Sequence, residues 1–224
     1  MKIAIAQINS TVGDFDGNAD KIANAWRCAD EAGAGLIVLP ELALCGYPPR
    51  DLLAKPAFLR QNQAALEHLA RCGSKAVAVV GYASTNETDS GRPARNSAAV
   101  LHNGEVAAVR HKTLLPTYDV FDEDRYFEPA TDNTPVEILG KKVGLTICED
   151  IWNDEVFLHD RRYERRPAEE LADAGAELLL NLSASPWSLG KEHSRHELLS
   201  QLSAKAGCPL VYCNLVGGND ELVF

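Results

Sequence analysis

Three residues of different chemistry each close a short apolar segment of this chain. Glu41 ends the segment LIVLPE, Lys112 ends EVAAVRHK, and Cys148 ends VGLTIC. A carboxylate can take a proton, an ammonium group can stabilise an anion, and a thiolate can attack a carbonyl carbon. The apolar segments are typical of strands, and ligands bind at the carboxyl ends of strands in α/β sheets. The three residues together therefore predict a catalytic site.

Each of the three also has a simpler interpretation. A buried cysteine is more often a small core residue than a nucleophile, but Cys148 is followed directly by the acids Glu149 and Asp150, which favours a functional position. Glu41 could be a solvated acid after a strand. The residues that follow it carry few charges, however, so we expect it to be enclosed, with the raised pKa that suits a general base. Lys112 alone would be read as solvated.

His111 offers a rival interpretation, because it lies beside Lys112 and could pair with Cys148. We rank this Cys–His pair lower. Adjacent residues of a strand point to opposite faces of the sheet, so His111 would point away from a site that contains Lys112.

No metal or nucleotide motif is evident. His193 and His196 are three residues apart on an expected helix, but no cysteine or histidine set at zinc spacing accompanies them. We therefore expect both to be surface residues and expect no metal site. The sequence contains neither a GxGxxG pattern nor a P-loop.

The composition is that of an ordinary globular domain. The chain has 224 residues, with 46% apolar and 24% charged residues, and its length suits one large core. A formal net charge of −10 argues against a nucleic-acid partner or an anionic membrane surface. We find no signal peptide and no apolar stretch long enough to span a membrane. The six cysteines show no CxxC spacing, so we expect free thiols and a cytoplasmic protein.

Strand and helix patterns alternate along the chain. Strands are expected at 2–8, 35–40, 76–82, 136–139, 142–148, 177–183 and 208–215, and helices at 18–32, 57–71, 167–174 and 190–206. Residues 97–112 read as a hairpin around Asn103-Gly104. The aromatic-rich loop 113–135 is expected to be ordered and functional. This order predicts an α/β layered domain with a mixed sheet that contains one antiparallel pair.

Several segments resemble a known family. LPEL, HKTLLP and GLTICED, in this order, resemble the nitrilase superfamily of carbon–nitrogen hydrolases. Five longer segments look like the amidase domain of glutamine-dependent NAD synthetases: PELALCGYPPRDLL, KTLLPTYDVFDEDRYF, ICEDIW, NLSASPWSLGKEHSR and NLVGGNDELVF. The resemblance implies a four-layer α-β-β-α sandwich with mixed sheets over residues 1–224. Because residues 222–224 read like the opening of a further strand, we expect the sandwich to be truncated at its C-terminal edge.

The resemblance also implies catalytic roles. Glu41, Lys112 and Cys148 match the Glu–Lys–Cys triad, and Glu123 matches a second glutamate that orients the lysine. Glu41 would take the proton of Cys148, which attacks the side-chain amide of glutamine and forms a thioester. Lys112 and the backbone N–H of Glu149 would hold the oxyanion. We also expect Lys112 to favour the thiolate form of Cys148.

Four further residues match substrate-binding positions of the same family. Tyr118 would line the pocket, and Glu149 would pair with the substrate ammonium group. Ser185 and Lys191 would hold the α-carboxylate. These charges suit a zwitterionic amino acid.

The partners follow from the resemblance as well. A C-terminal synthetase domain with an SGGxDS loop is absent from this chain, and ATP, Mg²⁺ and deamido-NAD are expected only there. We expect no cofactor in this domain and a homo-oligomeric assembly. Two alternatives stay open: a stand-alone amidase of the nitrilase type that acts on another small amide, and a catalytically silent assembly module.

Overall fold

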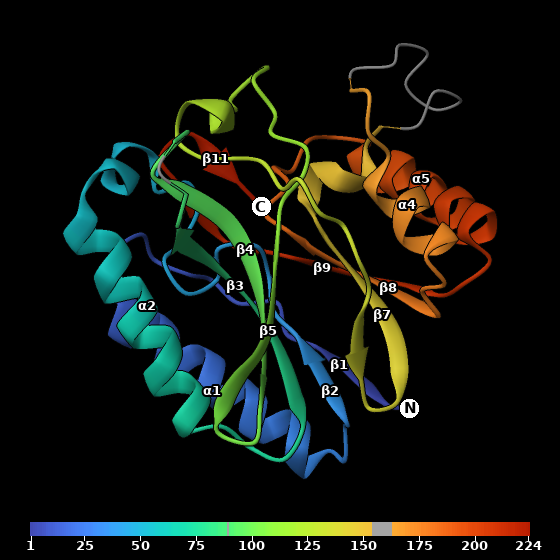
Figure 1. The fold of residues 1–224 in the computed structure, drawn as a ribbon, viewed down its shortest axis with the longest axis horizontal. Coiled ribbons are helices and arrows are strands. Elements are labelled where there is room, and N and C mark those ends of the chain that lie inside the picture. Colours follow the sequence, from blue (N-terminus) through green and yellow to red (C-terminus); the bar gives the residue numbers. More distant parts are fainter. Residues whose placement is uncertain (89, 154–162) are drawn as a thin grey trace.

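Two β-sheets lie face to face between two pairs of helices (Figure 1). The computed structural model describes residues 1–88, 90–153 and 163–224. The first sheet has the order β1-β2-β3-β4-β5 and contains β1 (Ile3–Ile5), β2 (Leu36–Val38), β3 (Val77–Thr85), β4 (Ala94–His102) and β5 (Glu105–His111). The second has the order β6-β7-β8-β9 and contains β6 (Val136–Ile138), β7 (Lys141–Ile147), β8 (Leu178–Ser183) and β9 (Leu210–Asn214).

Helices cover the outer face of each sheet. The first sheet is covered by α1 (Phe15–Glu31) and α2 (Pro56–Arg71), and the second by α4 (Pro167–Asp173) and α5 (Lys191–Ala206) (Figure 1). The shorter elements are the 3₁₀ helices η1 (Arg50–Ala54), η2 (Glu123–Arg125) and η3 (Cys148–Ile151), and the hairpin of β10 (Gly218–Asn219) with β11 (Leu222–Val223). The expected four-layer α-β-β-α sandwich is therefore confirmed.

The layers follow from the alternation of apolar side chains along the strands. In β2, Leu36 and Val38 pack into the core between the sheets, where they meet β7 and β8. Ile37, between them, points outward and packs with Ile22 and Trp26 of α1. Because both faces of the strand are covered, its sequence is apolar throughout. The continuous apolar run in the sequence therefore indicates that both faces of β2 are buried.

The hairpin of β4 and β5 agrees with its sequence signal. Asn103 and Gly104 join the two strands with φ angles of 53° and 85°, the left-handed pair that a tight two-residue turn requires. Ser97 of β4 lies opposite His111 of β5 in the resulting register. The prediction of a hairpin at 97–112 is confirmed, and it brings Lys112 to the end of β5.

The expectation of a single antiparallel pair was wrong. Among the described strands, β3 and β4, β4 and β5, and β6 and β7 all pair antiparallel. The link between β6 and β7 is another tight turn, in which Leu139 and Gly140 have φ angles of 50° and 73°. Leucine is a poor signal for a left-handed turn, so the sequence pattern did not reveal this hairpin. The strands are also divided between two sheets.

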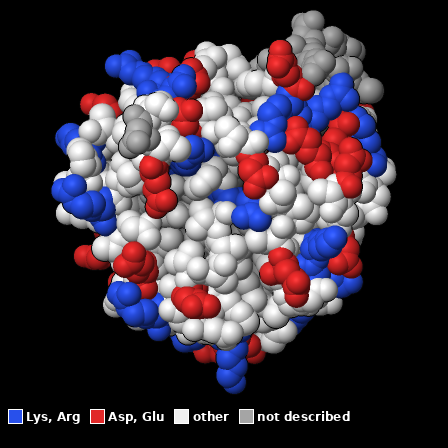
Figure 2. Space-filling view, in the orientation of Figure 1, with Lys and Arg blue, Asp and Glu red and all other residues white. Residues whose placement is uncertain are grey.

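The surface in the view of Figure 2 carries both signs of charge. Acidic and basic side chains are interspersed around a largely uncharged centre on this face. Among the described residues, no helix is long and apolar enough to cross a membrane.

Candidate active site

A buried lysine between two carboxylates forms the centre of the site. Lys112 Nζ lies 2.7 Å from Glu41 Oε1 and 2.7 Å from Glu123 Oε2. The three residues are only 1%, 0% and 5% exposed. They come from the segments after β2, after β5 and from η2, so the tertiary structure gathers them from well-separated parts of the chain.

Glu41 is fixed by donors from both sheets. Its Oε1 also accepts a hydrogen bond from Asn96 Nδ2 of β4, at 2.7 Å, and its Oε2 accepts one from the backbone N–H of Ala184, at 2.9 Å. Ala184 follows β8 of the second sheet. The carboxylate therefore has one defined orientation in an enclosed setting, as the few charges around it in the sequence predicted.

Glu123 and Lys112 shift each other's protonation. Burial raises the pKa of Glu123 to about 7, although the Lys112 ammonium opposes this rise. For Lys112, burial lowers the pKa, but the carboxylates of Glu123 and Glu41 outweigh it and hold the pKa well above its usual range. Tyr47 completes the cluster, because its hydroxyl donates to Glu123 Oε1 at 2.9 Å. The lysine therefore keeps its charge although it is buried.

Cys148 lies at a sharp turn between β7 and η3. Its φ angle of 44° is in the left-handed region, which is rare for a residue with a side chain and is found often at functional sites. The thiol is 4% exposed. Burial and the Glu41 carboxylate raise its pKa well above the usual range, and the Lys112 ammonium only partly offsets them. Lys112 thus favours the thiolate, as expected, but burial and Glu41 outweigh it, so the resting sulfur needs a base to remove its proton.

The thiol opens onto a small cavity of about 190 Å³. Besides Cys148, its lining includes the four residues that the sequence assigned to the substrate, together with Trp152 and Phe121: Tyr118, Glu149, Ser185 and Lys191. The structure thus brings all of these side chains to one cavity, although they come from well-separated segments of the sequence.

One side of the cavity is acidic. The hydroxyl of Tyr118 donates to both oxygens of Glu149, at 3.0 and 2.9 Å, and the hydroxyl of Tyr163 donates to Oε1 at 3.1 Å. These donors hold the carboxylate in place. The arrangement can receive a cationic group of a ligand.

The other side is basic. Lys191, at the start of α5, donates to the carbonyl of Pro186 at 2.9 Å and lies 5.8 Å from the ring of Trp152. Burial lowers its pKa. Arg195 donates through Nη2 to Ser185 Oγ at 3.3 Å. The lining thus includes the Glu149 carboxylate and the Lys191 ammonium group, the two charges that a zwitterion needs.

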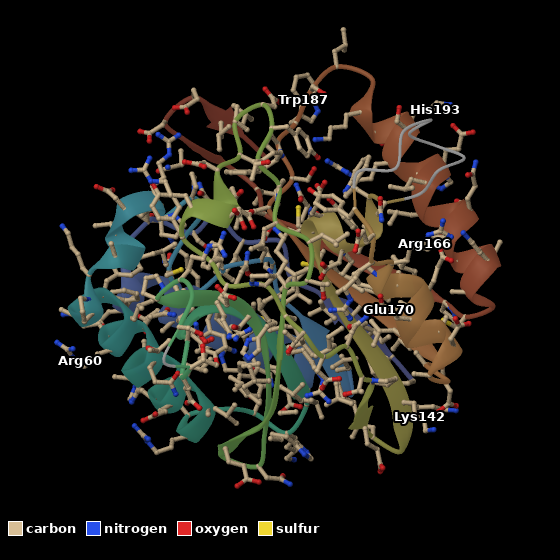
Figure 3. The ribbon with its side chains drawn as sticks, turned by 45° about the horizontal axis from the view of Figure 1, so that its top comes forward. Arg60, Lys142, Arg166, Glu170, Trp187 and His193 are labelled. Carbon is tan, nitrogen blue, oxygen red and sulfur yellow. The ribbon has the colours of Figure 1, made fainter. Side chains whose placement is uncertain are left out.

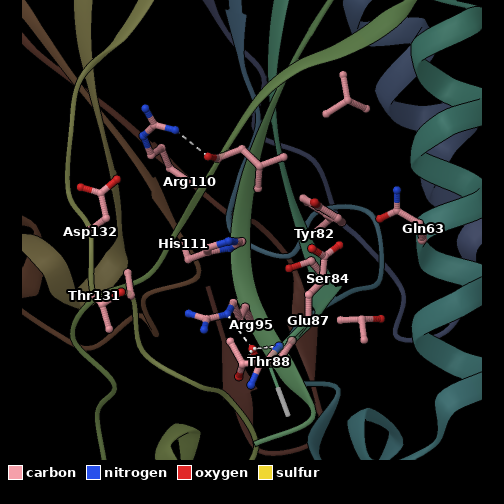
Figure 4. A pocket seen from close by; sticks show the side chains of 15 residues that line it. Gln63, Tyr82, Ser84, Glu87, Thr88, Arg95, Arg110, His111, Thr131 and Asp132 are labelled. Carbon is pink, nitrogen blue, oxygen red and sulfur yellow. Dashed lines mark hydrogen bonds between the residues drawn. The ribbon is translucent and has the colours of Figure 1, made fainter. Parts of the chain in front are cut away.

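His111 belongs to another part of the molecule. It lines a separate cavity of about 690 Å³ on the outer face of the first sheet, with Arg95 and Arg110 (Figure 4). Its Nδ1 lies 2.8 Å from Ser97 Oγ, and burial with the two arginines lowers its pKa to about 4. The strand alternation predicted this opposite placement of His111 and Lys112.

The two helical histidines are exposed, as expected. His193 lies at the outer edge of α5 (Figure 3), and His196 is exposed on the same helix. Within the ranges that the structure describes, no group of His, Cys, Asp or Glu side chains is arranged to hold a metal ion.

The sequence did not indicate three side chains that donate hydrogen bonds to carboxylates of the site. Asn96 and Tyr47 donate to Glu41 and Glu123, and Tyr163 donates to Glu149. Asn96 had a detectable signal, because an amide shortly before the apolar run at 98–101 of β4 is expected to be buried and then needs a polar partner. Tyr47 and Tyr163 lie in irregular segments, where no periodicity indicates a direction.

Comparisons with known proteins agree with this geometry. A model of the carbon-nitrogen hydrolase family matches residues 2–224. The glutamine-dependent NAD(+) synthetase of Synechocystis sp. is 44% identical over 226 residues, which cover 99% of this chain and 40% of the relative. This chain thus spans about two fifths of the length of that relative.

Two solved structures show the same fold. The glutamine-dependent NAD+ synthetase of Acinetobacter baumannii, in complex with ADP, has a TM-score of 0.88 at 36% identity, over 99% of this chain and 39% of that one. A mutant of the amidase of Nesterenkonia sp. AN1, with acrylamide added at its active-site cysteine, has a TM-score of 0.80 at 25% identity, over 100% of this chain and 82% of that one. With a family match over nearly every residue and a shared sandwich, this protein belongs to the carbon-nitrogen hydrolase family.

Proposed function

We propose that this domain hydrolyses the side-chain amide of glutamine to glutamate and ammonia through a thioester on Cys148. The observation that carries the proposal is one cavity lined by the Cys148 thiol, the Glu149 carboxylate and the Lys191 ammonium group, beside the buried Glu41–Lys112 pair. Glutamine has a side-chain amide that the sulfur can attack. It also has an α-ammonium group and an α-carboxylate group that Glu149 and Lys191 can bind.

The first half-reaction forms the thioester. Glu41 takes the proton of Cys148, and the sulfur attacks the amide carbon. The negative charge that develops on the amide oxygen is stabilised by Lys112 and by the backbone N–H of Glu149. The C–N bond then breaks, and the nitrogen leaves as ammonia with the proton returned by Glu41. The raised pKa of the thiol supports this scheme, because a protonated sulfur needs a neighbouring base.

The second half-reaction releases glutamate. Glu41 takes a proton from water, and the resulting hydroxide attacks the thioester carbon. The C–S bond breaks, and the sulfur regains the proton from Glu41. Glu123, which bonds Lys112 at 2.7 Å, keeps the ammonium group oriented in both steps.

Charge and position support the substrate assignment. Glu149 would pair with the α-ammonium group of glutamine, while Tyr118 orients that carboxylate. Ser185 and Lys191 would bind the α-carboxylate. A neutral aliphatic amide has no charged group to bind Glu149 or Lys191, so it would lack the charge-assisted contacts that glutamine can make.

The similarity to NAD synthetases supports a wider role. We propose that the released ammonia amidates deamido-NAD in an ATP-dependent step, which takes place on a synthetase domain outside this chain, and that the complete protein is a homo-oligomer. The support is the named synthetase relative of which this chain covers 40%.

A second candidate is a stand-alone amidase that acts on another small amide. It is favoured by one observation: this chain covers 82% of the Nesterenkonia amidase. Comparison of kcat/KM for glutamine and for propionamide separates the two. A preference of at least about 100-fold for glutamine is expected, because propionamide lacks the charged groups that could form ion pairs with Glu149 and Lys191.

The central test is glutamate release from glutamine by the wild type and by Cys148→Ala. The variant is expected to lose roughly 10⁴-fold or more in kcat, because no other group can form the thioester. Cys213→Ala is the matched control, since Cys213 is also buried in the core between the sheets but is not among the residues that line the cavity. Retained turnover in Cys148→Ala would refute the assignment of the nucleophile.

A silent assembly module is tested by covalent labelling. A glutamine-like chloroketone is incubated with the folded protein, and the modified residue is found by mass spectrometry. An adduct on Cys148 that excess glutamine suppresses is expected. No adduct on folded protein would favour the silent module.

A further inference from the structure

Asp150 is a buried carboxylate for which the proposed reaction scheme has no role. It lies in η3, two residues after Cys148, and is 4% exposed. Its Oδ1 accepts hydrogen bonds from the backbone N–H groups of Thr113 and Leu114, at 3.0 and 2.8 Å. Its Oδ2 accepts one from the backbone N–H of Ile147, at 2.9 Å.

These three bonds connect the two sheets at the candidate site. Thr113 and Leu114 directly follow Lys112 at the end of β5, in the first sheet. Ile147 is the last residue of β7, in the second sheet, and directly precedes Cys148. One side chain thus ties the segment that carries the ammonium group to the segment that carries the sulfur.

Only an ionised carboxylate can make this set of bonds. It accepts on both oxygens, whereas an amide has one acceptor oxygen and one NH₂ donor. An asparagine here would turn a donor toward a backbone N–H. Burial raises the pKa of Asp150 to about 6, while the three N–H donors and Lys112 favour the charged form. A buried charge of this kind costs stability, so its presence needs a reason other than packing.

We propose that Asp150 is a positioning residue that holds Lys112 at the distance from Cys148 where the oxyanion develops. The proposal rests on the proposed function for its kinetic consequence. Because the acid binds backbone on both sides, a shift of either strand end changes the separation of the ammonium group and the sulfur. A displacement of about 1 Å is enough to cost roughly 100-fold in rate.

The test compares Asp150→Asn with the wild type in glutamine hydrolysis. We expect kcat to fall about 100-fold while KM for glutamine changes less than about threefold, since Asp150 itself is not among the residues that line the cavity. Asp173→Asn is the matched control, because Asp173 is an exposed acid at the end of α4. A kcat within about threefold of the wild type, or a loss confined to KM, would overturn the positioning role.

A second readout does not depend on glutamine hydrolysis. The rate of Cys148 alkylation by iodoacetamide at pH 8 reports the thiolate fraction, which falls when the Lys112 charge moves away. We expect Asp150→Asn to react at least about fivefold more slowly, which corresponds to a rise of about 0.7 in the pKa of the thiol. If the wild type is alkylated but releases no glutamate, the proposed function fails, and this ratio still decides the role of Asp150. Equal rates would overturn that role.

A variant that keeps the negative charge tests the proposal even if Asp150→Asn does not fold. Asp150→Glu places the same carboxylate on a longer side chain, which cannot reach both strand ends without moving one of them. We expect a cooperative thermal transition, and a kcat at least about tenfold below the wild type with KM unchanged. Wild-type kcat in folded Asp150→Glu would contradict the proposal, whether or not Asp150→Asn folds.

Discussion

At the scale of single residues, the buried Lys112 contributes more to the proposed chemistry than to the stability of the fold. Removal of a charge from water costs several kcal/mol, and a buried ion pair often only restores that loss. Lys112 is 1% exposed and has two carboxylates at 2.7 Å. One of them, Glu123, has a pKa of about 7 because burial disfavours its charge. The cluster is therefore a weak source of stability and a fixed, water-excluded cation for a developing oxyanion.

The raised pKa of Glu123 makes folding stability depend on pH. Unfolded, this carboxyl titrates near 4.5, but in the native protein it keeps its proton up to about pH 7. Between these values the native state binds more protons than the unfolded chain, so the contribution of Glu123 to the free energy of unfolding falls as pH rises. We expect Glu123→Gln to lack this decline. Urea unfolding of both proteins from pH 4.5 to 7.5 measures the difference, and a difference that is constant with pH would contradict the assignment.

At the scale of elements, one glycine fixes the segment that carries Glu41. Gly81 of β3 lies against residues 40–42, and a methyl group there would overlap the carbonyl oxygen of Pro40 and lie 2.8 Å from Glu41 Cα. The backbone of this segment passes so close to β3 that only hydrogen fits. Strand β3 therefore limits where the backbone of Glu41, the proposed base, can lie.

Gly81→Ala tests this element-level support. We expect a loss of at least about tenfold in kcat and about 1–3 kcal/mol in the free energy of unfolding, because the Glu41 segment must move. Gly35→Ala is the control, since a methyl group there meets only the ends of the flexible Leu139 and Met1 side chains, at 3.3 and 3.9 Å. Glutaminase kinetics and urea unfolding measure both effects. Wild-type kcat in Gly81→Ala would show that the segment does not need this support.

At the scale of the whole molecule, the core between the sheets joins the two halves of the site. Glu41 and Lys112 follow strands of the first sheet, and Cys148 follows a strand of the second. Leu36 and Val38 pack across this core against Leu145 and Leu180. The separation of the two sheets, and with it the depth of the site, is set by these apolar side chains.

Leu180→Ala is the test at this scale. Leu180 is fully buried in the core between the sheets, so the cavity left by its loss is expected to cost about 3 kcal/mol in the free energy of unfolding. Leu189→Ala, at a side chain that is 93% exposed, should change it by less than about 0.5 kcal/mol. Because both sheets share this core, tryptophan fluorescence and circular dichroism should report one common transition. Two separate transitions would show that the layers unfold independently.

The sequence alone predicted the types of secondary-structure elements and the kinds of reactive side chain. Alternation in β2 and the Asn103-Gly104 turn predicted a doubly covered strand and a hairpin, because both signals lie within a few neighbouring residues. The same alternation predicted that His111 and Lys112 point to opposite faces. A carboxylate, an amine and a thiol after three strands indicated where reactive groups would gather, and their catalytic roles stay predictions.

Only the tertiary structure decided the hydrogen-bond partners and the protonation states, whereas the four layers were already implied by the family resemblance. The bonds from Asn96, Tyr47 and Asp150 all join segments that are distant in sequence. The thiol of Cys148 is protonated because burial and Glu41 outweigh Lys112. Residue type and periodicity are local properties, whereas the dielectric surroundings and the hydrogen-bond donors of a side chain are set by whichever strands pack against it.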